Sequence, residues 1–279
     1  KLTDRQFVQL HHNFTYLEEA CITLEKHMAV CLRGAISSYE LCLNCEHAFD
    51  VMRGEVESEL FSKFTFFIEQ TVKTIRLDIA PVAAKQTLGS AESKKIVDAM
   101  ESFMPMIATL PLDVGQRALA LANSTVVASV ERHLGSQEVK VVSTEGLLQL
   151  RVDLALIEQC LQKFTVFSTD TANDAFAPLK QLLDLFLYDD WATLFTTYTN
   201  ADSVYKRVSL DTTAKVLAKY RESDDKTRSS VFVAMKTDRD KKKRKETIMA
   251  QLSELRGNKL PLLRTTRRVP GGSISRINL

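Results

Sequence analysis

Apolar residues recur at spacings of three and four along most of this chain, which is the pattern of amphipathic helices. The pattern is clearest within residues 4–33, where it continues over four heptad repeats. Its apolar seam is formed by Phe7, Leu10, Phe14, Leu17, Cys21, Leu24, Met28 and Cys31. A heptad seam is also typical of a coiled coil, but this mixed seam with two cysteines favours a long helix inside a bundle. Gly34 predicts the end of that helix.

Two more helices follow. The second is predicted from about Ser38 to Ile79, and it ends before Pro81 because proline cannot continue a helix. The third begins at Ser90 or Ser93, whose hydroxyl groups can cap its N-terminus. Pro105 inside this third helix predicts a kink or a break.

A fourth helix is predicted from about Asp113 through Leu134, and Gly135 closes it. The short polar stretch 136–144 then predicts a boundary between two helical subdomains. The expected parts are an N-terminal bundle at residues 1–140, a C-terminal bundle at residues 141–257, and a basic, flexible tail at residues 258–279.

The stretch from Leu147 to Trp191 carries two apolar helical faces on either side of a polar break. The first face consists of Leu147, Leu150, Leu154, Ile157, Leu161 and Phe164, and the second of Phe176, Leu179, Leu183, Phe186 and Leu187. The break, STDTAND, is rich in residues that bond their own backbone and favour turns. We therefore predict a helical hairpin with a continuous apolar seam, around which the chain is organised.

Three further helices are predicted toward the C-terminus. A short one spans residues 190–199 with Asp190 as its cap, and a second spans residues 209–221 with Ser209 or Asp211 as its cap. The last runs from about Ser230 to Arg256 and is apolar at both ends but charged throughout its middle. A helix that is polar all round in its middle must protrude into solvent or meet an acidic partner.

Composition agrees with an all-α chain. Of 279 residues, 45% are hydrophobic, which is enough for a full core, and the 9 Gly and 6 Pro are spread thinly. Segments with strand-like alternation are almost absent, and no apolar run approaches the roughly 20 residues that cross a bilayer. Because the chain starts with Lys1 in the middle of a pattern, we interpret it as a fragment of a longer protein.

The sequence carries no recognisable signature of catalysis, of a cofactor or of a metal site. The five cysteines favour reduced thiols that act as small hydrophobic residues, and the CxxC at Cys42 and Cys45 lacks the second ligand pair of a zinc site. No phosphate-binding glycine loop, HExxH motif or nucleophile elbow occurs. The five histidines show no ligand spacing with carboxylates, and acidic pairs such as Glu57 with Glu59 and Asp189 with Asp190 are expected on outer faces or at caps. We therefore predict a protein that is not an enzyme and has no cofactor.

The charge of the chain is concentrated near its C-terminus. Residues 236–279 contain 13 basic and 4 acidic residues, a net of +9, so residues 1–235 carry a net of −7. The basic run in the last helix comprises Arg239, Lys241, Lys242, Lys243, Arg244 and Lys245. It is interpreted as a solvated helix face, or as a contact for anionic lipid headgroups or an acidic protein patch. Nucleic acid is not expected as a partner, because the run lacks aromatic residues and the rest of the chain is acidic.

Several stretches resemble one known family. QLRVDLALIEQC, FAPLKQLLDLFLYDDWATLF, YKRVSLDTTAKVLAKYRES and KTDRDKKKRKETIMAQLSEL are similar to the C-terminal region of the exocyst subunit Sec-fifteen, and LKQLLDLFLYDDW is the most specific of these. FVQLHHNFTYLEEAC and AFDVMRGEVESELFSKFTFFIE resemble the preceding region of that family. The resemblance is strong from Leu147 to Leu255, weaker before it, and does not cover the tail after Gly257.

The resemblance implies an elongated stack of two helical bundle subdomains, as in other tethering complexes. It implies a non-catalytic exocyst subunit that tethers secretory vesicles to the plasma membrane and binds other exocyst subunits. It further implies that the C-terminal subdomain binds the GTP form of a Rab-type small GTPase. The expected location is the cytoplasm, peripherally at vesicle and plasma membrane sites.

The resemblance places the GTPase contact on the helices after the Trp191 block. The family often opens that helix with Val-Asn-Pro, whereas this chain has Val208, Ser209 and Leu210. If the apolar side of the helix faces inward, the outward residues are Ser209, Asp211, Thr212, Lys215 and Lys219, and these are the candidate contacts. Ser209 and Asp211 are equally suited to act as helix caps. The competing hypotheses are a module that binds anionic lipids through the basic run, and a plain helical scaffold within a complex.

Overall fold

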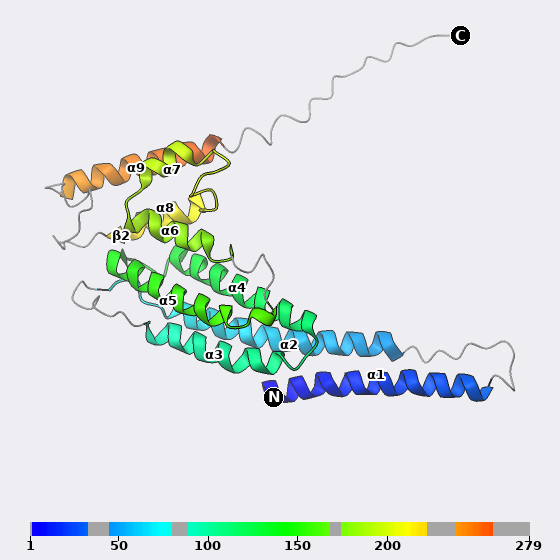
Figure 1. The fold of residues 1–279 in the computed structure, drawn as a ribbon. Helices are drawn as coiled ribbons and strands as arrows, with labels where there is room; N and C mark the ends of the chain where they lie inside the picture. The colour runs from blue at the N-terminus through cyan, green and yellow to red at the C-terminus, as the bar shows by residue number, and fades with distance from the viewer. Residues whose placement is uncertain (1, 33–44, 80–88, 168–173, 222–237, 259–279) are drawn as a thin grey trace, which may run out of the picture.

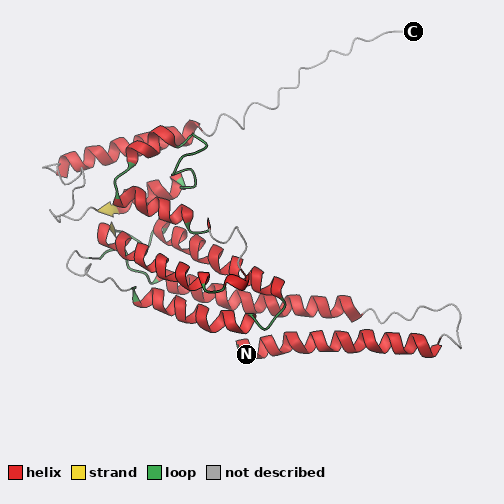
Figure 2. Cartoon of the chain, in the orientation of Figure 1, coloured by secondary structure: helices red, strands yellow, loops and turns green. Residues whose placement is uncertain are grey.

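The structure is a computed structural model that describes residues 2–32, 45–79, 89–167, 174–221 and 238–258. Within these ranges the chain is almost entirely helical, so the predicted all-α fold is confirmed (Figure 2). The elements are α1 (Asp4–Leu32), α2 (Cys45–Lys73), α3 (Ala91–Ile107), α4 (Leu112–Gly135), β1 (Val142–Ser143), α5 (Thr144–Gln162), η2 (Thr165–Phe167), α6 (Ala177–Leu187), α7 (Trp191–Thr197), α8 (Leu210–Lys219), β2 (Tyr220–Arg221) and α9 (Asp238–Asn258). The described helices include none that is both long enough and apolar enough to span a membrane.

The helices α1 and α2 lie side by side and project from the rest of the molecule as a two-helix arm (Figure 1). The N-terminal helix begins and ends close to the predicted positions, whereas Gly34 lies outside the described residues. Three polar contacts between side chains of the two helices, Glu18 with Arg53, His11 with Glu57 and Asp4 with Lys63, show that the helices are antiparallel.

The helix α2 ends at Lys73, so the predicted continuation to Ile79 is wrong. The backbone leaves the helix because residues 75–79 find other partners. The carbonyl of Ile75 lies 2.9 Å from His133 Nε2, and Ser143 donates from its backbone N–H and its hydroxyl group to the carbonyl of Leu77. These bonds replace the helical ones, and Pro81 lies outside the part of the chain that the structure describes.

The helices α2, α3, α4 and α5 pack around the main apolar core. Phe64 of α2 stacks on Phe103 of α3 with ring centroids 4.1 Å apart. Ser90 caps α3, as predicted, by accepting from the backbone N–H of Ser93 at 3.1 Å. Pro105 does not break α3, since the helix continues to Ile107.

The predicted hairpin is present, because α5 packs against α6. Most of its polar break, residues 168–173, lies outside the described part of the chain. Trp191 opens α7 and packs edge-on against Phe186 of α6, with ring centroids 5.1 Å apart. The short strands β1 and β2 form a parallel pair that brings Val142 beside Tyr220.

Buried apolar residues form one continuous cluster from Val8 on α1 to Leu252 on α9. The arm lies at one end of the molecule and α9 at the other, so the described chain is elongated (Figure 1). The division into two subdomains near residue 140 stays a prediction.

Candidate functional site

The N-terminus of α8 is capped by Ser209, one of the predicted GTPase contacts. Its hydroxyl oxygen accepts from the backbone N–H of Thr212 at 3.3 Å and from the Thr212 hydroxyl group at 3.1 Å. Both side chains are half-buried. The hydroxyl groups of Ser209 and Thr212 therefore satisfy the first turn of the helix, as expected for an N-cap.

Asp211, also a predicted contact, is exposed and forms an ion pair with Arg256 of α9 at 2.5 Å. Arg256 also donates to the carbonyl of Leu210 at 3.0 Å. The C-terminal part of α9 is thus held at the beginning of α8. An incoming partner would meet Asp211 and Arg256 together.

The two lysines of α8 differ in their surroundings. Lys215 is exposed, whereas Lys219 is half-buried and donates to the carbonyls of Leu134 and Ser136 at the end of α4. Burial lowers the pKa of Lys219 below its ordinary value, and nearby Lys215 lowers it further. Lys219 therefore stabilises the C-terminus of α4, where a cation is favourable, and Lys215 remains the lysine of α8 that a partner can reach.

Some side chains of the basic run on α9 are exposed to solvent, and others contact the rest of the chain. Lys242 and Lys243 are exposed and Lys241 is half-buried, whereas the side chain of Arg239 lies outside the described part. Lys245 donates to the carbonyls of Ala218 at 2.8 Å and Tyr220 at 3.4 Å, at the end of α8. Burial lowers the pKa of Lys245, as does nearby Arg221.

Arg244 provides the second inward contact of this run. Its guanidinium donates to Asp189 at 2.7 Å, and the carboxylate side chain is only 8% exposed. The charged middle of this helix was expected to protrude into solvent or to meet an acidic partner, and Arg244 fits the second alternative because Asp189 of the same chain is its acidic partner. Asp189 was expected on an outer face or at a cap; it directly follows Tyr188, the C-cap of α6, and its side chain is buried against Arg244.

The corner between α6 and α7 is built by two adjacent carboxylates. Asp189 has a positive φ of 58°, a conformation that aspartate tolerates better than most residues. Asp190 occupies the N-cap position of α7, but its side chain accepts from the hydroxyl groups of Thr193 at 2.6 Å and Tyr205 at 2.9 Å rather than from the backbone. The two side chains thus anchor α9 and the loop before α8.

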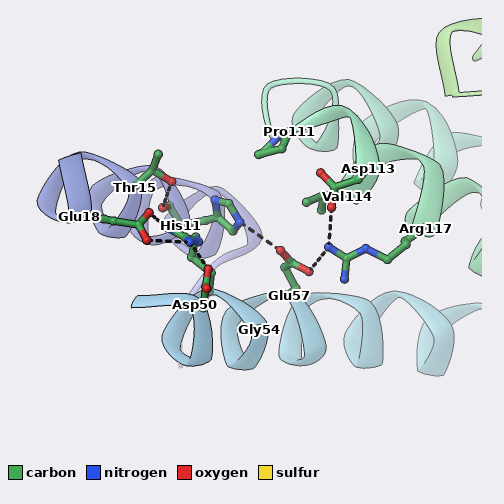
Figure 3. A pocket seen from close by; sticks show the side chains of 11 residues that line it. His11, Thr15, Glu18, Asp50, Gly54, Glu57, Pro111, Asp113, Val114 and Arg117 are labelled. Atoms are coloured by element: carbon green, nitrogen blue, oxygen red, sulfur yellow. Dashed lines mark hydrogen bonds and ion pairs between the residues drawn. The ribbon is translucent and has the colours of Figure 1, made fainter. Parts of the chain in front are cut away.

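A separate cleft of about 450 Å³ lies where α1 and α2 meet the beginning of α4 (Figure 3). His11 is 2% exposed, and its Nε2 lies 3.1 Å from Glu57, whose other oxygen accepts from Arg117 of α4 at 2.8 Å. Glu18 and Asp50 pair with Arg53 in the same cleft (Figure 3). Glu57 was expected on an outer face or at a cap and is instead buried, because it joins all three helices.

These charged groups bind one another, so the cleft connects the arm to the bundle. His11 and Glu57 are 46 positions apart, which is why no local spacing could pair them. No group of three or more His, Cys, Asp or Glu that could hold a metal occurs within the described ranges. Cys160 is buried and Cys31 is exposed, each as a free thiol.

The comparisons with known proteins agree on one family. The family described as "Exocyst complex subunit Sec15 C-terminal" matches residues 1–219. The chain is 28% identical over 254 residues to "Exocyst complex component 6" of Homo sapiens, an alignment that covers 90% of this chain and 31% of that protein. Identity to the proteins of the same name is 27% over 262 residues in Caenorhabditis elegans and 24% over 259 residues in Drosophila melanogaster. These alignments cover 91% of this chain in both cases, and 31% and 32% of the respective relatives.

The chain spans about a third of the length of these relatives. No solved structure matches it. The family match covers well over half of the chain and includes α1 to α8, on which the candidate GTPase contacts lie. This chain belongs to the family of the exocyst complex subunit Sec-fifteen, and it contains the C-terminal region of that family.

Proposed function

We propose that this chain is part of a non-catalytic exocyst subunit that tethers secretory vesicles to the plasma membrane as the effector of a GTP-bound Rab-type GTPase. The observation that carries this proposal is the family match over residues 1–219. An elongated all-α molecule supports it, since such a molecule offers long outer faces to partners (Figure 1). The protein would act in the cytoplasm, peripherally at vesicle and plasma membrane sites, together with other exocyst subunits.

The GTPase contact is proposed on the outer line of α8. Asp211, Lys215 and Ala218 are exposed at spacings of four and three, so they share one face of the helix. Asp211 adds its ion pair with Arg256 to that face. Ser209, Thr212 and Lys219 border the face but also serve the fold, so their substitution affects both binding and stability.

The test is charge reversal at Lys215, measured as binding to a Rab-type GTPase loaded with a GTP analogue. Lys215→Glu is expected to weaken binding at least about tenfold, because an interfacial like-charge contact costs more than 1 kcal/mol. Lys95→Glu is the matched control, since Lys95 is also an exposed lysine but lies on α3. Unchanged binding by a folded Lys215→Glu variant would argue against α8 as the contact.

The second candidate function is binding to anionic membranes through α9. The observation that favours it is that Lys242 and Lys243 are adjacent and exposed on the described helix. Each basic residue near an anionic surface contributes about 1 kcal/mol, so Lys242→Ala with Lys243→Ala should weaken vesicle binding roughly 30-fold. Sedimentation with phosphatidylserine vesicles and with neutral vesicles tests this, and equal sedimentation with both would exclude it.

A plain scaffold within the complex is the remaining alternative. It predicts that neither the GTPase nor the anionic vesicles bind, while other exocyst subunits still do. The two experiments above therefore separate all three functions.

A further inference from the structure

One edge of α1 carries apolar side chains that α2 does not cover. Leu10, Leu17, Leu24 and Cys31 are separated by seven positions, so they form one line along the helix. Leu17 is 50% and Leu24 is 51% exposed, and Cys31 is exposed as well. Part of the heptad seam of α1 therefore faces away from its neighbour.

The helix α2 carries a matching line. Met52, Glu59 and Phe66 are also separated by seven positions, and all three are exposed, Met52 by 42% and Phe66 by 62%. A carboxylate thus stands in the middle of an otherwise apolar line. No basic side chain of the described ranges forms an ion pair with Glu59.

The pairing between the helices sets the two lines opposite each other. Glu18 pairs with Arg53 and His11 pairs with Glu57. Leu17 directly precedes Glu18, and Met52 directly precedes Arg53. Because the two helices are antiparallel, the side chains of Leu17 and Met52 therefore point to the same side of the helix pair. In this register Leu17 lies across from Met52, and Leu10 lies across from Glu59.

The opposite side of the arm is already occupied. The cleft lined by His11, Thr15, Gly54 and Glu57 faces the beginning of α4 (Figure 3). The ammonium group of Lys63 on α2 lies over the ring of Phe7 on α1, 4.1 Å from its centroid. The two lines therefore share one face of the arm, which we call the arm face, formed by Leu10, Leu17 and Leu24 of α1 and by Met52, Glu59 and Phe66 of α2.

We propose that the arm face binds an amphipathic helix of another exocyst subunit, which carries apolar residues at heptad spacing and one Lys or Arg that faces Glu59. Two parallel lines with a seven-residue repeat are what a third helix of a coiled coil packs against. A single polar position inside such a seam fixes the register of the partner. The choice of an exocyst subunit as the source rests on the family assignment.

The charge of the arm favours a basic partner. The helices α1 and α2 together contain ten acidic and five basic residues. Burial of the Glu59 carboxylate without a cation would be costly, so an apolar or acidic seam is disfavoured. A second copy of this chain would bring two acidic arms together, which also disfavours a symmetric dimer.

The test uses two synthetic helical peptides of about four heptads that differ in one seam residue. The Lys peptide has lysine at the position that faces Glu59, and the Glu peptide has glutamate there. The chain should bind the Lys peptide at least about tenfold more tightly, and Glu59→Lys should reverse this preference. Glu19→Lys is the matched control, because Glu19 is an exposed residue of α1 outside the arm face.

The natural partner is then sought by mixing the chain with each other exocyst subunit, purified singly. We expect one subunit to bind the unchanged chain but not the Glu59→Lys variant. The same subunit should not bind the variant that combines Leu17→Ser with Leu24→Ser, while both variants still bind the GTPase. Equal binding of both peptides, or of neither, would overturn the proposal. A dimer of the free chain that dissociates with Glu59→Lys would also overturn it, since the arm face would then bind a second copy.

Discussion

Arg244 of α9 donates to the carboxylate of Asp189 at the corner between α6 and α7, at a distance of 2.7 Å. The Asp189 side chain is 8% and the Arg244 side chain 20% exposed, so both charges are largely withdrawn from water. Burial raises the pKa of Asp189 above its ordinary value, and the hydrogen bond from Arg244 acts in the opposite direction without cancelling it. The pair therefore determines where α9 docks more than it adds net stability.

Removal of Arg244 should be costly because it leaves the Asp189 carboxylate buried without its cation. We expect Arg244→Met to lower the free energy of unfolding by about 3 kcal/mol. The folded state of this variant holds a proton on Asp189 more tightly than the unfolded state does, so its stability deficit should shrink as pH falls toward the ordinary aspartate pKa. Urea unfolding at pH 7 and pH 5 measures both effects.

The double variant Asp189→Asn with Arg244→Met is the control for that experiment, because it removes both charges. Asparagine also tolerates the positive φ at position 189. The free energy of unfolding of the double variant should exceed that of Arg244→Met and should not show the same dependence on pH. A double variant less stable than Arg244→Met would contradict this account of the pair.

The cap of α8 can be separated from its candidate role in binding. Ser209→Ala removes the oxygen that accepts from the backbone of Thr212, so it should lower the free energy of unfolding by about 1 kcal/mol. Ser209→Asn retains a good cap, so it should change the free energy of unfolding by only about a few tenths of 1 kcal/mol. If thermal unfolding shows equal losses in both variants, Ser209 does not act as the cap.

The fold and the candidate site differ in how far the sequence could predict them. The seven-residue repeat of Leu10, Leu17 and Leu24 is a local signal, so it predicted the position and length of α1 closely. The end of α2 depends on bonds to Ser143 and His133 from other parts of the chain, and no local signal carries them. Residue pairs that are distant in the sequence and meet only in the folded chain could not be predicted, for the same reason.

The basic run shows the limit of reading charge from a sequence. Lys243 and Arg244 are adjacent and chemically alike, yet one is exposed and the other docks on Asp189. Which side of α9 faces inward is set by Ile248 and Leu252, whose buried side chains fix the rotation of the helix. The sequence contained the LYDDW motif that includes Asp189, but nothing local linked it to a residue 55 positions away.

Tyr205 should make the stability of the fold fall at alkaline pH. Burial raises the pKa of this phenol far above its ordinary value of 10, and its hydrogen bond to Asp190 raises it further. The folded state retains the proton that the unfolded state loses above about pH 10, so this contribution is complete below pH 10 and declines above it.

Tyr205→Phe tests this contribution because it cannot ionise. Its free energy of unfolding should decrease less between pH 9 and pH 11 than that of the unchanged chain, as measured by urea unfolding followed by circular dichroism. Tyr16→Phe is the matched control, since Tyr16 is 67% exposed on α1. Parallel pH profiles for the Tyr205→Phe variant and the unchanged chain would refute the assignment.

Two glycines at helical positions predict opposite effects of alanine. A Cβ at Gly146 would lie 2.2 Å from the carbonyl oxygen of Leu77, which is backbone and cannot move aside, so Gly146→Ala should destabilise the fold by more than about 2 kcal/mol. A Cβ at Gly54 would meet nothing within 4 Å, so Gly54→Ala should stabilise α2 by about 0.5–1 kcal/mol. Thermal unfolding of both variants measures the difference, and a shift of the same sign in both would contradict the described packing.

We propose that the described C-terminal helices of this chain bind a Rab-type GTPase in its GTP form. The most direct measurement is isothermal titration of the chain with each Rab-type GTPase of the same organism, loaded in turn with a GTP analogue and with GDP. We expect at least one of them to bind about tenfold or more tightly in the GTP form, a difference of about 1.4 kcal/mol, and Lys215→Glu to weaken this binding. Absence of binding, or equal affinity for both nucleotide states across the whole set, would contradict it.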